Sequence, residues 1–204
     1  MKLFRSFRKN DDGAVTVETS FLILSLIILT GGAIEAGYAL FQWNGAQTAA
    51  RTGARIAATS DPVATQMNTM TGLSNSVAVG DPMPYYRLEC DNKNKTCDAG
   101  GYDATAMSRI VFGPDGDNRC GATTRARRGM CDIFSETKRA NVSVAYQNSG
   151  LGKAGYQTDP APLVTVTLKD VPLKFVFLDL VGFSNIATLP PVQATVMGED
   201  LKNG

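Results

Sequence analysis

The 204-residue sequence contains no histidine. Without imidazole the chain cannot form a Ser-His-Asp or Cys-His nucleophile system, an HExxH metalloprotease helix or a zinc site that needs histidine. An excess of one charge is also missing, because 20 Lys and Arg residues face 19 Asp and Glu residues. A nearly neutral chain lacks the long-range field that draws general nucleic-acid binders to polyanions. We therefore expect neither a common hydrolase nor a nucleic-acid partner.

Proline is absent and charge is nearly absent from residues 14–43, which read AVTVETSFLILSLIILTGGAIEAGYALFQW. Glu18 and Glu35 are the only charged residues in this stretch. The 16 uncharged residues between them would span about 24 Å as a helix, close to the roughly 30 Å hydrocarbon core of a bilayer. Apolar residues on either side of this stretch supply the remaining length needed to cross the bilayer. The stretch predicts a transmembrane helix over about residues 19–41.

Four cations precede the apolar stretch, at Lys2, Arg5, Arg8 and Lys9, and the next ones are Arg51 and Arg55. The positive-inside rule therefore makes residues 1–13 a basic cytoplasmic leader and sends residues 59–204 to the periplasm. A cleavable secretory signal is the alternative, because it shares the basic start and the apolar core. Such a core is typically about 7–15 residues long and ends at a small-x-small site, whereas here the helical pattern continues.

Small residues recur at every fourth position after the apolar stretch, in two adjacent rows: Gly45, Ala49, Gly53 and Ala57, and Ala46, Ala50, Ala54 and Ala58. Such rows let another backbone approach closely. The partner is either the chain's own domain or neighbouring subunits, and both contacts are compatible with different lengths of the rows. Arg51 and Arg55 share a polar edge that we expect to face solvent or an acidic partner. The helix is predicted over residues 14–58, ending before Ser60-Asp61-Pro62.

The sequence after Pro62 becomes rich in Gly, Asn and Asp. Residues 63–73 keep a weak helical pattern, and residues 80–133 are typical of turns and loops. Farther on, apolar and polar residues alternate as in half-buried strands, with apolar positions at Val142, Val144 and Tyr146, at Val164, Val166 and Leu168, and at Val192, Ala194 and Val196. Residues 171–181 predict a strand or a short helix. The expected fold class is α+β, a long N-terminal helix followed by an antiparallel sheet.

Four cysteines lie in the part assigned to the periplasm, where disulfides form: Cys90, Cys97, Cys120 and Cys131. Among the three pairings, Cys90–Cys97 and Cys120–Cys131 are favoured because closing a short loop costs less entropy. A four-thiolate zinc site is the alternative. Its usual spacing of two to four residues is narrower than the gaps of six and ten here. We expect disulfide-pinned loops and no metal or redox chemistry.

Two polar clusters accompany the second cysteine loop. An arginine cluster would suit phosphate or an acidic partner, at Arg119, Arg125, Arg127 and Arg128. Nearby aspartates favour a solvated loop that compensates its own charge instead, at Asp115, Asp117 and Asp132. Asp115, Asp117 and Asn118 offer oxygen ligands for calcium, but the later glutamate of an EF-hand loop is missing. No short motif places a nucleophile beside a base, so we expect no catalytic residue, no cofactor and no metal.

A more specific pattern opens the apolar stretch. In the sequence GAVTVE, residues 13–18, Gly13 precedes the apolar run and Glu18 lies five residues after Gly13. This arrangement resembles a prepilin processing site. GAIEAGY follows at residues 32–38, and QTAARTGARIAA at residues 47–58. Together these segments resemble the TadE-like family of tight-adherence pilus assembly proteins, whose pattern is a GAxxVE opening, an EFG-type triplet and an NAAR-x-GAR-x-A helix. Ala36 replaces the aromatic residue of the triplet, and Thr19 follows Glu18 where an aromatic residue is common.

The resemblance implies a pilin-like fold and a minor pilin or pseudopilin of the bacterial inner membrane, required for a Flp-type pilus. Its partners would be the membrane, a prepilin peptidase that cuts between Gly13 and Ala14, and other pilin subunits with their assembly machinery. The new ammonium on Ala14 would bind Glu18 of a neighbouring subunit in a dry bundle of helices. Alternatively, Glu18 snorkels to the cytoplasmic interface. The alternative function is a membrane-tethered periplasmic binding or sensor module unrelated to pili.

Overall fold

The computed structural model describes residues 11–114, 118–121, 127–155, 161–180, 182 and 187–198. The chain divides into two compact units. The helical unit comprises residues 1–41 and 174–185, and the sheet unit comprises residues 42–173 and 186–204. A short segment from late in the sequence therefore belongs with the N-terminal helix.

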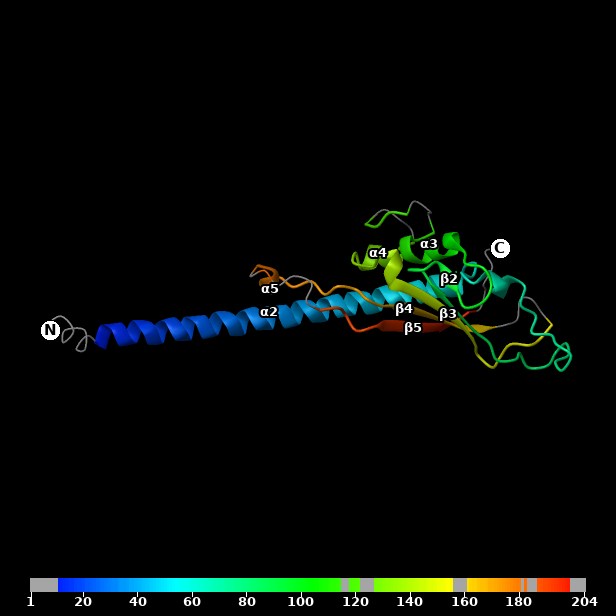
Figure 1. Ribbon diagram of the computed structural model, residues 1–204, viewed down its shortest axis with the longest axis horizontal. Coiled ribbons are helices and arrows are strands. Elements are labelled where there is room, and N and C mark those ends of the chain that lie inside the picture. Colours follow the sequence, from blue (N-terminus) through cyan, green and yellow to red (C-terminus); the bar gives the residue numbers. More distant parts are fainter. Residues whose placement is uncertain are drawn as a thin grey trace. The chain divides into compact units, whose positions relative to one another are not determined.

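Helix α2, Asp11–Ala58, is one continuous α-helix (Figure 1). The hydroxyl groups in its apolar part are satisfied by the helix itself, because Thr19, Ser20, Ser25 and Thr30 each donate to the carbonyl four residues earlier at 2.8 Å. Such bonds remove the cost of placing a hydroxyl in an apolar environment. The helix ends at Ala58, as the sequence predicts.

The sheet unit contains a five-stranded antiparallel sheet of order β2-β1-β3-β4-β5. Its strands are β1 (Arg87–Asp91), β2 (Thr96–Cys97), β3 (Val142–Asn148), β4 (Pro162–Leu168) and β5 (Val192–Met197). Val144 in the central strand β3 lies opposite Cys90 on one side and Val166 on the other. This register turns the apolar positions of all the longer strands to the same face.

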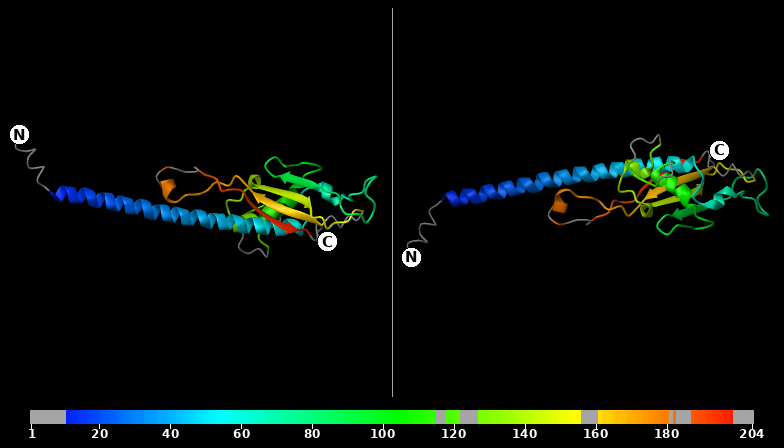
Figure 2. Two further views of the ribbon diagram at one scale, coloured as in Figure 1. Left: turned by 90° about the horizontal axis from the view of Figure 1, so that it is seen from below. Right: turned by 90° about the horizontal axis from the view of Figure 1, so that it is seen from above.

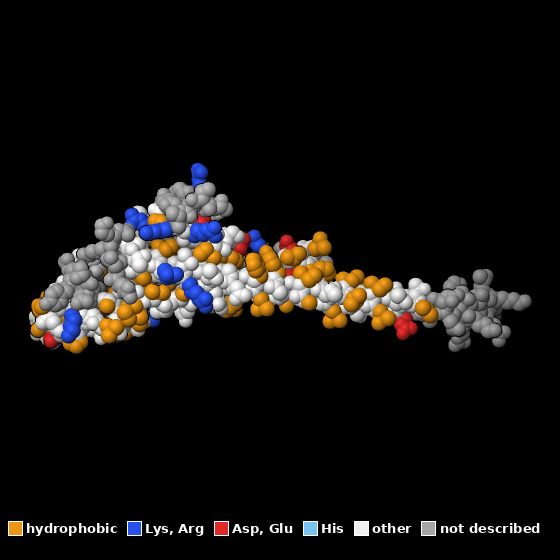
Figure 3. All heavy atoms as spheres, turned by 180° about the vertical axis from the view of Figure 1, so that it is seen from behind, with side chains coloured by type: hydrophobic (Ala, Val, Ile, Leu, Met, Phe, Trp, Pro, Cys, Tyr) orange, Lys and Arg blue, Asp and Glu red, His pale blue; other side chains and the backbone are white. Residues whose placement is uncertain are grey.

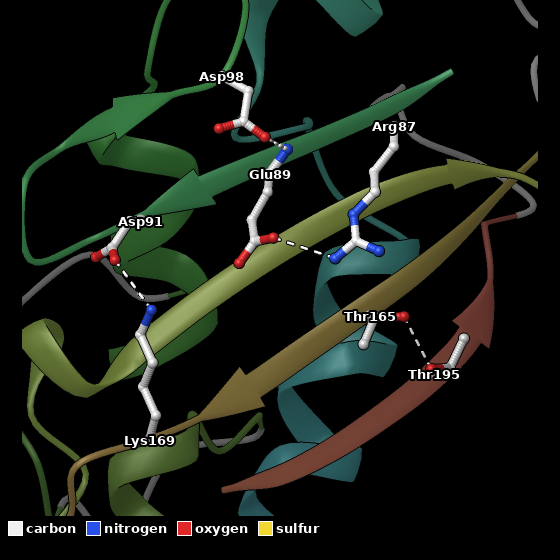
Figure 4. A network of polar contacts seen from close by, with 7 residues as sticks. All are labelled: Arg87, Glu89, Asp91, Asp98, Thr165, Lys169 and Thr195. Carbon is white, nitrogen blue, oxygen red and sulfur yellow. Dashed lines mark hydrogen bonds and ion pairs between the residues drawn. The ribbon is translucent and has the colours of Figure 1, made fainter. Parts of the chain in front are cut away.

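That apolar face forms the core of the sheet unit with residues 42–58 of α2, helix α3 (Ala104–Phe112) and helix α4 (Met130–Ile133) (Figure 2). Val144, Tyr146 and Val166 have no exposed surface. The opposite face of the sheet is polar (Figure 4), with ion pairs Arg87–Glu89 at 3.2 Å and Lys169–Asp91 at 3.0 Å. Thr165 and Thr195 share a hydroxyl hydrogen bond of 2.8 Å on this face.

The predicted fold class is confirmed, and so are the three strands that the alternating apolar residues indicate. The prediction of loops throughout residues 80–133 is wrong, because this region contains β1, β2, α3 and α4. Helix α3 begins after Asp103, whose side chain accepts the N–H groups of Thr105 and Ala106 at 2.7 and 3.0 Å, and it stops at Gly113. In residues 63–73 only a short 3-10 turn forms, η2 (Thr65–Asn68), and another, η3 (Arg139–Asn141), precedes β3.

Candidate functional site

The part of α2 in the helical unit exposes many large apolar side chains, and Figure 3 shows those on one face. Their exposed fractions are 46–72%, for Val15, Val17, Phe21, Leu22, Ile23, Leu24, Leu26, Ile27, Ile28, Leu29, Ile34, Leu40 and Phe41. A long helix whose large apolar side chains are mostly left uncovered by protein matches a lipid environment. Within the described chain, α2 is the one helix long and apolar enough to cross a membrane. This apolar helix indicates that the chain is anchored in a membrane.

Gly13 and Glu18 both lie in the first turns of α2, about 7.5 Å apart along its axis. A Cβ atom added to Gly13 would meet nothing within 4 Å. Glu18 is exposed, and no described residue lies within hydrogen-bonding distance of its carboxylate. Residues 1–10, which include the four cations of the predicted leader, and the side chain of Ala14 lie outside the described part of the structure. The predicted processing motif thus lies on an exposed part of the helix, with its glutamate unpaired among the described residues.

Glu35 lies in a different environment, with an exposed fraction of only 8%. Its carboxylate accepts the backbone N–H groups of Val176 at 3.1 Å and of Leu178 at 2.9 Å, and also that of Phe177 between them. These three donors open helix α5, Phe177–Leu180, which belongs to the same unit as this part of α2. Hydrogen bonds to a carboxylate are stronger than those between neutral groups. A single side chain therefore holds a segment that is distant in the sequence.

Gly31, one turn before Glu35, makes room for this segment. A Cβ atom on Gly31 would lie 3.3 Å from ring carbons of Phe177, whereas one on Gly32 would meet nothing within 4 Å. Gly31 is buried and Gly32 is exposed. Beside the contact, Ile28, Gly32, Glu35, Phe177 and Leu178 line a small pocket of about 340 Å³. Glu35, Gly31 and residues 174–180 form what we call the clip.

Sequence reasoning assigned Glu35 only to the end of the apolar stretch and to the EFG-type triplet, and it missed the clip. The available indication was the cost of a carboxylate in an apolar helix, which calls for a partner. The partner is a row of backbone N–H groups, and no residue type marks such a row in a sequence.

The two rows of small residues pack inside the sheet unit. Their alanines are 0–1% exposed, at Ala46, Ala49, Ala50, Ala54, Ala57 and Ala58. A Cβ atom on Gly53 would lie 2.4 Å from Sδ of Met130, and one on Gly45 would lie 3.3 Å from the Phe134 ring. The sequence left open whether these rows contact the chain's own domain or neighbouring subunits, and the structure shows the contact with the chain's own domain. Arg51 and Arg55 are exposed, as expected.

A basic pocket of about 900 Å³ lies in the sheet unit, with Arg55, Arg109, Arg127 and Arg128 in its lining. Arg109 is paired with Asp61 at 2.8 Å. Two arginines of the predicted cluster, Arg127 and Arg128, thus lie beside two others from distant parts of the sequence. Arg119 does not line this pocket, and Arg125 lies outside the described residues.

The structure contains the disulfides Cys90–Cys97 and Cys120–Cys131, which is the pairing that the sequence favours. Cys90 and Cys97 lie opposite each other on β1 and β2. Asp132, which the sequence predicts to compensate arginines, accepts the backbone N–H groups of Gly121 at 2.8 Å and Gly129 at 3.0 Å. Asp115 and Asp117 lie outside the described residues, and the described ones include no group of three or more His, Cys, Asp or Glu residues arranged to hold a metal.

Comparison with known proteins identifies one family. The model described as TadE-like protein matches residues 13–55, which include Gly13, Glu18, Glu35 and most of the small-residue rows. This match confirms the resemblance over the N-terminal part of the chain. No curated protein and no solved structure matches the chain.

Proposed function

We propose that this chain is a TadE-like minor pilin or pseudopilin, a structural or assembly subunit of a Flp-type pilus. The observation that carries the proposal is Glu18, an exposed carboxylate with no partner among the described residues, on a helix that otherwise exposes apolar side chains. Glu18 follows Gly13 at the spacing of a prepilin processing site. The family match supports a role in pilus assembly and covers both residues.

Cleavage by a prepilin peptidase would couple processing to assembly. Hydrolysis of the Gly13–Ala14 peptide bond releases the leader with a carboxylate on Gly13 and leaves an ammonium on Ala14. Before the cut, that nitrogen belongs to an uncharged amide. A carboxylate within a membrane helix costs about 2.5–3.5 kcal/mol on insertion scales, so Glu18 gains from pairing with the ammonium of a neighbouring subunit. The same cut removes the leader cations Lys2, Arg5, Arg8 and Lys9, which loosens the cytoplasmic anchor.

The surface of the helix provides the contact with other subunits. In this proposal the exposed apolar side chains between Phe21 and Ile34 pack among other pilin helices. The small-residue rows act inside the chain, where they hold the sheet unit on its own helix. No catalytic group takes part, and the chain works through packing surfaces.

Electron microscopy of a deletion strain, with and without a complementing copy of the gene, tests the proposal. We expect the deletion to abolish or strongly reduce surface pili, and the complementing copy to restore them, while growth is unaffected. Intact mass of the membrane-extracted protein should show loss of residues 1–13. Normal filaments without the gene would overturn the pilus assignment, and retention of the first 13 residues would reduce the N-terminus to a plain membrane anchor.

The basic pocket favours a second candidate function, a membrane-tethered binding module. Four arginines around one hollow of about 900 Å³ would suit an anionic ligand or an acidic segment of a partner. Localisation separates the two functions. A pilus subunit should appear in sheared filaments or copurify with the assembly machinery, whereas a tethered binding module should remain in the membrane fraction of cells whose pili are normal.

A further inference from the structure

The clip presents apolar side chains on the same unit as the apolar helix. Val176, whose backbone N–H donates to Glu35, and Leu180, two residues after Leu178, have side chains that are 56% and 82% exposed, respectively. Both views of Figure 2 show this segment, with α5, beside the middle of α2. Glu35 thus fixes two exposed apolar side chains next to a helix surface that is itself apolar and exposed.

We propose that the clip is a second membrane contact, in which Glu35 holds residues 174–180 on α2 so that Val176 and Leu180 insert into the bilayer interface. The leaflet is the one nearer the C-terminal end of the helix. The inference goes beyond the proposed function and does not depend on it, because it concerns how this chain meets lipid whether or not it enters a pilus.

The position of Glu35 along α2 sets the depth of the clip. Exposed apolar side chains continue past Glu35 to Leu40 and Phe41, at 63% and 72% exposure, and the next residue, Gln42, is buried. Six residues of helix between Glu35 and Phe41 correspond to about 9 Å along the axis. Interfacial apolar segments lie about 5–10 Å into the boundary between headgroups and acyl chains. The clip is therefore held at the depth of such a segment.

The hydrogen bonds of Glu35 suit a site poor in water. A short helix leaves its first N–H groups without partners, and water satisfies them when the helix is in solution. In an apolar environment an unsatisfied backbone group costs several kcal/mol. The carboxylate of Glu35 satisfies three such groups at once, those of Val176, Phe177 and Leu178. The same bonds compensate the carboxylate for its own loss of water.

Charge and size favour lipid over a second copy of the chain as the occupant. Lys174 and Asp179 are both exposed within the clip, which fits the headgroup level better than the dry centre of a bilayer or a protein interface. A stable protein interface buries about 800 Å² on each partner and uses about 20–30 residues. The part of the clip outside α2 has only seven residues, 174–180, and it lies beside the exposed apolar surface of α2.

Depth-dependent fluorescence quenching tests the proposal on the full chain. Trp43 is the single tryptophan, so the double variant Trp43→Phe/Leu180→Trp reports from the clip alone. The protein is reconstituted into vesicles of phosphatidylcholine and phosphatidylglycerol that carry lipids brominated at shallow or deep acyl positions. We expect blue-shifted emission and stronger quenching by the shallow bromines than by the deep ones. Circular dichroism confirms that each variant is folded.

Two further substitutions in this background test the role of Glu35. Glu35→Gln removes the charge and one acceptor oxygen, and we expect a red shift and loss of most of the shallow quenching. Glu18→Gln makes the same chemical change at an exposed position of the same helix, and it should leave both signals unchanged.

Three results would overturn the proposal. Emission typical of water, quenched by soluble acrylamide but not by brominated lipid, would show that the clip does not reach the bilayer. Full quenching in Glu35→Gln would show that the carboxylate does not hold it. A blue shift that disappears as the lipid-to-protein ratio is raised would identify a second copy of the chain as the occupant. None of these results depends on pili, so a failure here is distinct from a failure of the proposed function.

Discussion

Glu35 and Leu178 are joined by a hydrogen bond of 2.9 Å across 143 positions of the sequence. The carboxylate that ends the uncharged part of the apolar helix is also the anchor of a segment near the C-terminus. A hydrogen bond to a charged group contributes about 1.5–3 kcal/mol. The bonds to Val176 and Phe177 add to this one, so the loss of Glu35 should free the whole start of α5.

Amide hydrogen exchange measures how strongly Glu35 holds the start of α5. In Glu35→Ala the amides of Val176, Phe177 and Leu178 lose their acceptor, and we expect them to exchange at least about tenfold faster, since 1.4 kcal/mol corresponds to a factor of ten. The measurement uses the full chain in lipid nanodiscs. Glu18→Ala serves as the matched control and should not change exchange at these amides. Equal protection in Glu35→Ala and the wild type would contradict the assignment of Glu35 as the acceptor.

Much of the fold follows from the period of the apolar residues. Val142, Val144 and Tyr146 alternate with smaller or polar residues, and alternation over seven positions is enough to mark strand β3. The long helix can likewise be predicted from the sequence, because no proline interrupts its apolar run. Strand β1, RLECD, shows the same alternation, with Leu88 and Cys90 buried, but over only five residues of which three are charged. This short pattern lies among the turn-forming residues of 80–133, and it was overlooked there.

The parts of the candidate site whose residues are close in the sequence could be predicted from the sequence. Gly13 and Glu18 stand five residues apart, so a local pattern names them. The clip joins residues 31 and 35 to residues 176–178, and its donors are backbone groups that every residue type except proline carries. The basic pocket is similar, since Arg55 and Arg109 join Arg127 only through the fold.

Glu18 is expected to act in assembly and not in insertion. Glu18→Ala removes a charge from an exposed position of a membrane helix, so the protein should still reach the membrane. It should be absent or strongly reduced in sheared filaments, because the ammonium on Ala14 of a neighbouring subunit would have no partner. Immunoblots of the membrane and filament fractions measure both. Thr19→Ala, next to it, removes a hydroxyl bonded within its own helix and is the control. Incorporation of Glu18→Ala at the wild-type level would contradict the assembly contact.

A side chain at Gly53 is expected to destabilise the sheet unit. A Cβ atom there would lie 2.4 Å from Sδ and 2.7 Å from Cγ of Met130, inside the core of the sheet unit. Overfilling a packed site costs about 1–3 kcal/mol, so Gly53→Leu should lower the free energy of unfolding by about that amount. Thr48→Leu places the same side chain on an exposed position of the same helix and should have little effect. Urea unfolding in detergent, followed by near-ultraviolet circular dichroism, compares the two. Equal stability of Gly53→Leu and the wild type would contradict this close packing.

Tyr146 is expected to make the sheet unit sensitive to alkali. Its side chain is fully buried, its hydroxyl accepts the N–H of Val63 at 2.9 Å, and burial raises the pKa of Tyr146. Burial also raises the pKa of Tyr86, to about 12. Above about pH 10 an unfolded tyrosine releases its proton while these two keep theirs. The unfolded state then binds fewer protons, so the free energy of unfolding falls as the pH rises above about 10.

Tyr146→Phe separates the two effects of this hydroxyl. At neutral pH the variant leaves the N–H of Val63 without an acceptor, which should cost about 1–3 kcal/mol. Between about pH 9 and 11 it should lose less stability than the wild type, because Tyr146 no longer adds to the alkaline loss, whereas Tyr86 and Tyr102, whose pKa values burial also raises, still contribute. Tyr85→Phe, at a side chain 74% exposed, should unfold like the wild type at neutral pH. Urea unfolding at several pH values tests the set, and an alkaline loss in Tyr146→Phe equal to that of the wild type would show that Tyr146 does not cause it.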